Sequence, residues 1–423
     1  MATTTDNYDI VISLDIGYNK TKVTVNGLIF NVPSDIVDVT GKDNYIGNIK
    51  KAGYIASTYI HDTKHLIGEQ ARMLLGEYEY KQQQFDKVDI MNSYDRFSTQ
   101  DAETHLMTCI GLALIKYTEF QKRQKCLCPN LDEPILVRKN EGNEERKDDW
   151  KIFVILGYPH DVYRRIYNAV KPNICRRHTF SIETEDQIYN LDFEIDGGKV
   201  LSYSQALAAF MGMISSDDGE IEPSNEYLKK VPCIVIDGGQ KTMGIYKISS
   251  NMQIGQDSSN TQFAMNNVYE RVVEEIHEKY GRPDIEVYNI VGILENDHGI
   301  ITAYDAEDDS TKEVDITEMV DKYEREVCSE LIDYLNENFN RLVDYKAIFV
   351  AGGTGAAFYD QLEEYITTKR ENITIYLADY EFLGKKIRPD QAISVGLYKI
   401  AKHLIRTMKL EAAKKGKTAS KEA

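Results

Sequence analysis

Residues Val231 to Ile248 read VPCIVIDGGQKTMGIYKI and decide the expected fold. Four apolar residues, Cys233 to Ile236, run into Asp237-Gly238-Gly239, and an extended pattern resumes from Met243 to Ile248. This pattern predicts two strands joined by a tight glycine turn. Glycines let backbone N–H groups approach an anion, and an aspartate beside them suits phosphate binding when Mg²⁺ lies between the two. The alternative is an ordinary Asp-Gly hairpin without a ligand.

The chain contains the same pattern a second time, near its start. Residues Tyr8 to Val25 read YDIVISLDIGYNKTKVTV, with an apolar strand, an Asp-x-Gly turn at Asp15 and Gly17, a polar loop and a second strand. The two hairpins lie about 220 residues apart. This repetition predicts two similar half-domains that face each other across one nucleotide.

Two further segments complete the pattern. Residues Leu201 to Ile214 have the apolar spacing of a helix packed on a sheet, with Gln205 near the first turn. Residues Tyr345 to Phe358, YKAIFVAGGTGAAF, predict a strand that ends at Gly352-Gly353-Thr354-Gly355 and opens a helix. Backbone amides at such a helix start favour phosphate or hydroxyl oxygens. The sequence contains neither the P-loop motif nor a G-x-G-x-x-G motif in a βαβ context, which disfavours those nucleotide-binding classes.

The four elements, in this order along nearly the whole chain, resemble the superfamily of actin, sugar kinases and heat-shock chaperone ATPases. The resemblance implies an α/β fold, with two similar α/β domains of the actin-like ATPase (ribonuclease H-like) type flanking a nucleotide cleft, each with a smaller inserted subdomain. Sugar kinases would need a G-x-D-x-[ST] motif, and chaperones would need a further domain after the ATPase. Neither feature is convincing in this sequence.

Three shorter segments resemble ParM-type bacterial plasmid-segregation actins. They are the Ile67-Gly68-Glu69-x-Ala71 turn, the strand-to-helix segment Ile155 to Pro159, and GQDSSN after the second hairpin. The resemblance implies a cytoplasmic cytoskeletal ATPase that polymerises into filaments and moves plasmid DNA through a DNA-binding adaptor protein. A small-molecule kinase of the same fold and a nucleotide-gated regulator that does not polymerise stay open as alternatives.

The resemblance also assigns roles to individual residues. Gln205 is similar to the residue that orients the attacking water, with a helix-surface amide as the alternative, and Asp237 joins it as a catalytic residue. Asp15 and Asp237 are the expected Mg²⁺ ligands, through water. ATP is the expected nucleotide, with GTP as the alternative. The expected nucleotide-binding residues are Asp15, Gly17, Tyr18, Asn19, Lys22, Gly238, Gly239, Gln240, Lys241, Thr242, Gly352, Gly353, Thr354 and Gly355.

The length of 423 residues suits two domains of about 200 residues each. We expect a first domain at 1–220 with an insertion at about 34–98, and a second at 221–410 with an insertion at about 262–343. Within the second, 284–294 is expected to be extended, 297–311 an acidic loop and 390–408 a closing helix. A basic, disordered tail is expected at 411–423, and a solvated loop at 129–150.

Composition limits the partners and the compartment. The net charge of −18 argues against direct DNA binding, because acidic surfaces are repelled by phosphates. The six cysteines form no disulfide framework, which favours a reducing cytoplasm. The N-terminus lacks a signal-peptide pattern, and no apolar run is long enough to span a bilayer, so no membrane association is expected.

Overall fold

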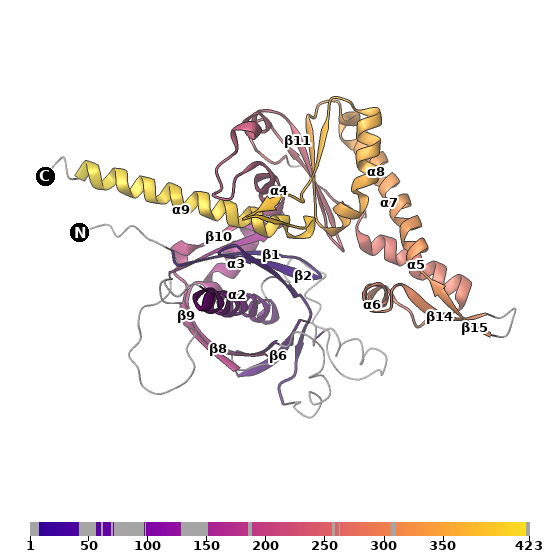
Figure 1. The fold of residues 1–423 in the computed structure, drawn as a ribbon, viewed down its shortest axis with the longest axis horizontal. Helices are drawn as coiled ribbons and strands as arrows, with labels where there is room; N and C mark the ends of the chain where they lie inside the picture. The colour runs from indigo at the N-terminus through magenta and orange to yellow at the C-terminus, as the bar shows by residue number, and fades with distance from the viewer. Residues whose placement is uncertain are drawn as a thin grey trace. The chain divides into compact units, whose positions relative to one another are not determined.

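The computed structural model describes residues 8–41, 56–60, 62–68, 71, 97, 99–127, 151–184, 188–255, 259–261, 263–305 and 310–419. The predicted loop at 129–150, most of the predicted insertion at 34–98, Glu69 of the first ParM-like turn and residues 256–258 of GQDSSN lie outside these ranges. The chain divides into two compact units (Figure 1). Unit 1 comprises Met1–Glu222, Glu381–Lys385 and Ile393–Ala423, and unit 2 comprises Pro223–Tyr380 and Lys386–Ala392.

Unit 1 is built on a five-stranded sheet in the order β10-β7-β1-β2-β3. Three strands, β1 (Ile10–Ile16), β2 (Lys20–Val25) and β3 (Leu28–Pro33), form an antiparallel meander. The strands β7 (Ile152–Tyr158) and β10 (Val200–Ser204) continue the sheet in parallel with β1. Every residue of β7 is buried, as expected for a strand covered on both faces.

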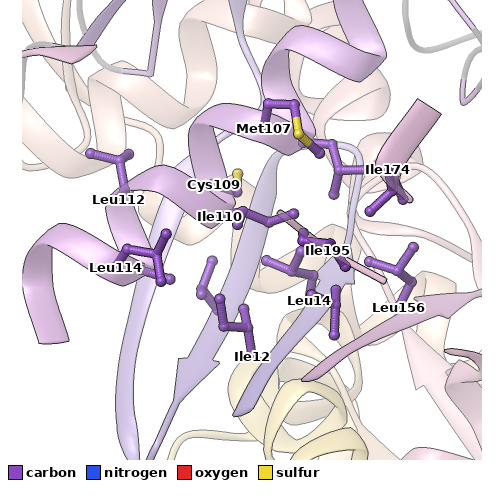
Figure 2. Packing of buried hydrophobic residues seen from close by; sticks show 14 of the residues in the cluster. Ile12, Leu14, Met107, Cys109, Ile110, Leu112, Leu114, Leu156, Ile174 and Ile195 are labelled. Carbon is purple, nitrogen blue, oxygen red and sulfur yellow. The ribbon is translucent and has the colours of Figure 1, made fainter. Parts of the chain in front are cut away.

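Helix α2 (Gln100–Leu127) supplies much of the apolar core of unit 1. Figure 2 shows its residues Met107 and Ile110 among Leu14 of β1, Leu156 of β7 and other buried side chains. Helix α3 (Tyr163–Ile174) adds Ile174 to the same cluster. The apolar residues of α2, from Leu106 to Ile115, are therefore buried in this core.

A second sheet of unit 1 has the strand order β4-β6-β5-β8-β9. Its strands are β4 (Ile36–Asp38), β5 (Ala56–Ile60), β6 (Thr63–Ile67), β8 (Arg177–Glu183) and β9 (Ile188–Glu194). β5 pairs antiparallel with both β6 and β8, so segments more than 100 residues apart along the chain share one sheet.

Unit 2 contains a five-stranded sheet in the order β13-β12-β11-β16-β17. The strands β11 (Cys233–Gly238), β12 (Met243–Ile248) and β13 (Ser259–Thr261) are antiparallel, whereas β16 (Ala347–Ala351) and β17 (Thr374–Leu377) run parallel to β11. This is the strand order of the first sheet of unit 1. The prediction of two similar α/β halves is thus confirmed.

Three helices pack in unit 2: α5 (Met265–Tyr280), α7 (Thr317–Asn338) and α8 (Gly353–Lys369). Figure 1 shows α7 and α8 next to each other, and buried Cys328 of α7 lies against the Phe358 carbonyl of α8. The short 3-10 helix Pro223–Lys230 leads into β11.

Two predictions for the insertion of unit 2 are wrong. The segment expected to be extended forms helix α6 (Val287–Asn296), which begins at a capping box between Glu286 and Asn289 and buries Ile290. The expected acidic loop at 297–311 instead includes β14 (Ile300–Asp305) and the start of β15 (Ser310–Asp315), and the two strands pair as a hairpin. The β-branched residues of 284–294 favoured a strand, but the cap and the apolar core favour the helix.

Helix α9 spans Ala392–Ala419, so residues 411–419 continue the helix where a disordered tail was expected. The predicted closing helix of the second half also packs within unit 1, because Ile393–Ala423 belong to that unit. A hairpin of β18 (Glu381–Phe382) and β19 (Lys385–Lys386) precedes it. Among the helices of the described segments, none has the length and apolar composition to cross a bilayer.

Candidate functional site

The first candidate cluster surrounds the turn between β1 and β2 in unit 1. Asp15 lies near the end of β1, where its register partners are Lys22 on β2 and Gly157 on β7. Its carboxylate is buried, with Oδ1 accepting a hydrogen bond of 2.6 Å from Gln205 Nε2 and Oδ2 lying 3.3 Å from Lys22 Nζ. The lysine offsets the carboxylate charge, and the amide provides a directed donor.

Two hydrogen bonds from Ser34 hold the backbone of this short turn in place. The hydroxyl of Ser34 donates to the Gly17 carbonyl at 2.9 Å, and the Ser34 amide donates to the Asn19 carbonyl at 2.9 Å. A Cβ at Gly17 would lie 2.8 Å from the Lys20 carbonyl oxygen and 3.0 Å from Lys22 Nζ. Glycine therefore permits the close return of β2 over the turn. Tyr18, the remaining predicted residue of this loop, is partly exposed.

Gln205 is the first residue of helix α4 (Gln205–Ile214). Ser204 is the N-cap, and its hydroxyl accepts a hydrogen bond from the Leu207 amide. β10 ends at this cap and runs parallel to β7, so the helix starts at the same sheet edge as the end of β1. Gln205 is buried and bonded to Asp15, so the alternative of a helix-surface amide is wrong.

Gly157 also belongs to this cluster, although it is not among the site residues predicted from the sequence. A Cβ at Gly157 would lie 3.5 Å from Gln205 Cγ and 2.6 Å from Leu397 Cδ1 of α9. A side chain at this position would contact Gln205 and would require the side chain of Leu397 to move. The sequence feature that points to this position is the glycine directly after the apolar run Ile152 to Leu156, which permits a close contact at the end of a strand.

A buried histidine of helix α2 contacts the β1–β2 hairpin. His105 Nε2 of α2 is 3.0 Å from the Thr21 hydroxyl and 3.5 Å from Cys109 Sγ. Burial lowers the pKa of His105 to about 4, so the ring is neutral at pH 7. Burial also raises the pKa of the Cys109 thiol, which makes this cysteine an inert core residue.

The second candidate cluster is the β11–β12 turn of unit 2. Asp237 pairs in register with Gly244 on β12 and with Ala351 on β16, as Asp15 pairs with Lys22 and Gly157 in unit 1. The lysine of the first turn thus has a glycine as its counterpart in the second. The Gly239 amide donates to the Thr242 carbonyl at 2.9 Å and closes the turn.

The same turn is anchored to the neighbouring helix. The Asn266 amide of α5 donates to the Gln240 carbonyl at 2.8 Å. Lys241 lies between Gln240 and Thr242 in this turn. The backbone of the turn is therefore held by one hydrogen bond within the turn and by another from helix α5.

The third predicted motif, Gly352 to Gly355, packs directly against this turn. The Thr354 hydroxyl donates to the Gly239 carbonyl at 2.7 Å. A Cβ at Gly352 would lie 2.2 Å from the Gly238 carbonyl oxygen, and one at Gly238 would lie 2.2 Å from the Gly355 amide nitrogen. The first amides of α8 and the glycine turn therefore form one backbone surface, on which an anion is favoured by the helix dipole.

The donor set bears on whether Mg²⁺ fits these residues. In the described part of the chain, no group of three or more His, Cys, Asp or Glu side chains is arranged to hold a metal. Mg²⁺ keeps several waters and binds through one or two carboxylates together with phosphate oxygens. Each glycine turn offers one such carboxylate, Asp15 in unit 1 and Asp237 in unit 2.

Sequence comparison finds no matching protein-family model and no similar curated protein. Solved structures do resemble the chain. The apo pSK41 ParM protein has 14% identity and a TM-score of 0.60, covering 94% of this chain and 98% of its own. A 15-stranded ParM filament from Clostridium botulinum has 15% identity and a TM-score of 0.59, covering 94% and 100%. An archaeal actin homologue in complex with ADP has 14% identity and a TM-score of 0.56, covering 93% and 99%. Both units take part in the likeness.

Proposed function

Because this chain has the actin-like fold, with similarity to ParM proteins and to an archaeal actin homologue, we propose that it is a nucleotide-dependent ATPase that polymerises into filaments. The observation that carries the proposal is the buried contact of Asp15 with Gln205 and Lys22 at the end of a strand. Burial of a carboxylate is unfavourable unless the carboxylate is paired and hydrogen-bonded, and Lys22 and Gln205 meet that requirement beside the glycine turn.

We assign each residue of this cluster a distinct role in the proposed reaction. A carboxylate only accepts hydrogen bonds, so the amide nitrogen of Gln205 faces Asp15 and its Oε1 is left to accept from a water O–H. This orients the water for in-line attack without removing its proton. Lys22 lies 3.3 Å from Asp15 and is the residue that we propose to bind the terminal phosphates.

Mg²⁺ bound with the nucleotide would neutralise phosphate charge, as in other phosphoryl-transfer sites. Asp15 and Asp237 would hold its waters, and the amides of the two glycine turns would bind phosphate oxygens. The Gly352 to Gly355 turn would bind the nucleotide at the start of α8. ATP is the proposed nucleotide, with GTP as the alternative; the ADP complex of the archaeal homologue supports a nucleotide of this class.

The proposed partner is a second copy of the same chain. The filament formed by the Clostridium botulinum ParM supports self-association of this fold. We further propose that the filament moves plasmid DNA through a DNA-binding adaptor in the cytoplasm. An adaptor is needed because a chain with a net charge of −18 has little affinity for a polyanion.

The test is to follow phosphate release, light scattering and sedimentation after adding ATP and Mg²⁺, and to examine the product by electron microscopy. Filaments that appear with ATP and disassemble after hydrolysis are the expected result. Hydrolysis by a chain that stays monomeric at tens of micromolar would refute polymerisation. Stimulation by a sugar or carboxylate acceptor would indicate a kinase, and nucleotide binding without filaments or turnover would indicate a regulator.

The Mg²⁺ assignment has its own test in unit 2. We expect Asp237→Ala to abolish the Mg²⁺ dependence of nucleotide affinity, measured by titration calorimetry with and without EDTA. Asp360→Ala, which changes an exposed aspartate of α8, is the matched control and should bind as the unmodified protein does. Unchanged Mg²⁺-dependent binding in Asp237→Ala would exclude this residue from the site.

A further inference from the structure

Helix α9 contacts the elements that carry the unit 1 cluster. The Ser13 hydroxyl of β1 donates to the Ser394 carbonyl at 2.7 Å, and the Thr24 hydroxyl of β2 donates to the Ser394 hydroxyl at 3.1 Å. Ser13 lies two residues before Asp15, and Thr24 lies two residues after Lys22. The first turn of α9 therefore lies directly against the hairpin that carries both charged residues.

The same helix approaches α4 at backbone distance. A Cβ at Gly396 would lie 1.9 Å from the Ala208 carbonyl oxygen and 3.3 Å from Gly212 Cα. The two helices can approach this closely because glycine lies at the crossing on both of them. The position of α4 is consequently set by α9 within very narrow steric limits.

One buried charge joins the two helices at the end of α4. Lys399 of α9 is 2% exposed, and its Nζ donates to the Gly212 carbonyl at 2.8 Å and to the Ser215 carbonyl at 2.7 Å. These carbonyls belong to the C-terminal end of α4, where the last backbone acceptors have no partner within the helix. A cation at this end also interacts favourably with the helix dipole.

The surroundings of Lys399 show that its burial is unfavourable by itself. Burial lowers the pKa of Lys399 to about 8, while Asp217 and Glu222 act in the opposite direction. The Phe382 ring centroid lies 6.0 Å from Nζ. A neutral side chain would avoid this desolvation but would leave two carbonyls of α4 without a strong donor.

Helix α4 has ten residues, which corresponds to a rod of about 15 Å. Gln205 lies at one end of this rod and the Lys399 contacts lie at the other. We propose that Lys399 is a positioning residue, which fastens the C-terminal end of α4 to α9 and thereby holds Gln205 against Asp15 in the orientation that directs the water. This inference rests on the proposed ATPase function for its catalytic consequence and on the geometry alone for the placement of Gln205.

The first experiment measures turnover in Lys399→Met, which has similar length and no donor. We expect kcat for ATP to fall by about 10-fold to 100-fold, because a misplacement of about 1 Å has that effect, while KM changes little. Lys402→Met, on the same helix but without these contacts, is the control and should keep full turnover. In a Gln205→Ala background, Lys399→Met should cause almost no further loss, because both act through one amide. An equal loss in both backgrounds would overturn the proposal.

The second experiment does not require activity. Selective ¹⁵N labelling of glutamine gives a side-chain amide signal for Gln205, assigned by its loss in Gln205→Ala. We expect this signal to move toward the values of exposed amides in Lys399→Met and to stay in place in Lys402→Met. An unchanged signal would overturn the proposal. Should the unmodified protein hydrolyse no nucleotide, the ATPase function fails, and this signal still decides the positioning role.

A third variant covers the case in which Lys399→Met does not fold, as judged by circular dichroism. Lys399→Gln keeps one neutral donor for the two carbonyls of α4, so the fold should be retained. Its Gln205 signal should lie between those of the unmodified protein and an exposed amide. A Gln205 signal identical to that of the unmodified protein would refute the role of Lys399.

Discussion

Replacing Gly238 with alanine should destabilise unit 2 before any nucleotide is added. The new Cβ would lie 2.2 Å from the Gly355 amide nitrogen and 2.9 Å from Gly355 Cα, both of them backbone atoms that cannot rotate away. Ordinary contact begins at 3.4 Å, so β11 and the start of α8 would have to separate by about 1.2 Å. Overpacking of this kind costs about 1–3 kcal/mol of folding free energy.

The matched control is Gly353→Ala in the same glycine turn. A Cβ at Gly353 would meet no atom within 4 Å, and alanine favours the helix that begins there. We therefore expect its free energy of unfolding to be unchanged or slightly raised. If Gly353 contacts the nucleotide as proposed, this variant should nevertheless bind ATP more weakly. The pair thus separates the packing of the turn from its contact with the ligand.

The assay is urea unfolding of the nucleotide-free protein, combined with hydrogen exchange on peptides covering 233–238 and 347–351. These two strands pair in parallel, so faster exchange in both would report separation at the turn. Equal stability of Gly238→Ala and the unmodified protein would refute the close approach of the two turns. Equal destabilisation of both variants would show that the contact between a Cβ at Gly238 and the backbone of Gly355 is not the cause.

Three further results are expected from the buried polar groups. The pKa of His105 is lowered to about 4, so below pH 6.5 the unfolded chain binds a proton that the folded chain does not. The free energy of unfolding should therefore fall by up to about 3 kcal/mol as the pH drops from 6.5 to 4. His105→Gln should lose this pH dependence in urea titrations, and an unaltered dependence would contradict a buried, neutral His105. The pKa of Lys399 is lowered from 10.5 to about 8, so as the pH rises the unfolded chain keeps the lysine proton to a higher pH than the folded chain does. The free energy of unfolding, relative to that of Lys399→Met, should therefore rise by up to about 3 kcal/mol between pH 8 and pH 10.5. A difference that does not change with pH in thermal melts would count against a buried ammonium. Thr354→Val should lower the free energy of unfolding by about 1–3 kcal/mol, because it leaves the Gly239 carbonyl without its donor. Hydrogen exchange in the β11–β12 turn should become faster. Unchanged exchange would show that this hydrogen bond contributes little to stability.

The two hairpins were predictable from the sequence because their signals are local. An apolar run followed by Asp and Gly specifies a strand and its turn through contacts only a few residues apart, and the antiparallel partner follows at once along the chain. The repetition at Asp15 and Asp237 then indicated two similar halves. The strand order of the two sheets, equal in both units, confirmed this.

The resemblance to actins pointed to Gln205, but residue spacing could not place it against Asp15. The two residues are 190 positions apart and meet only because β10 and β7 extend the sheet beside β1. Helix α6 shows the opposite case, in which a β-branched segment becomes helical because a capping box and a buried Ile290 outweigh its local preference.

The sequence by itself determined the α/β class, the duplication and the chemical types at both glycine turns, since these depend on local periodicity and turn chemistry. Only the tertiary structure decided that the amide of Gln205 faces Asp15, that Gly238 and Gly352 pack backbone to backbone, and that α9 joins unit 1 through Lys399. Such contacts join segments more than 100 residues apart, so their free energy appears only when the sheets have formed. For that reason no local pattern encodes them.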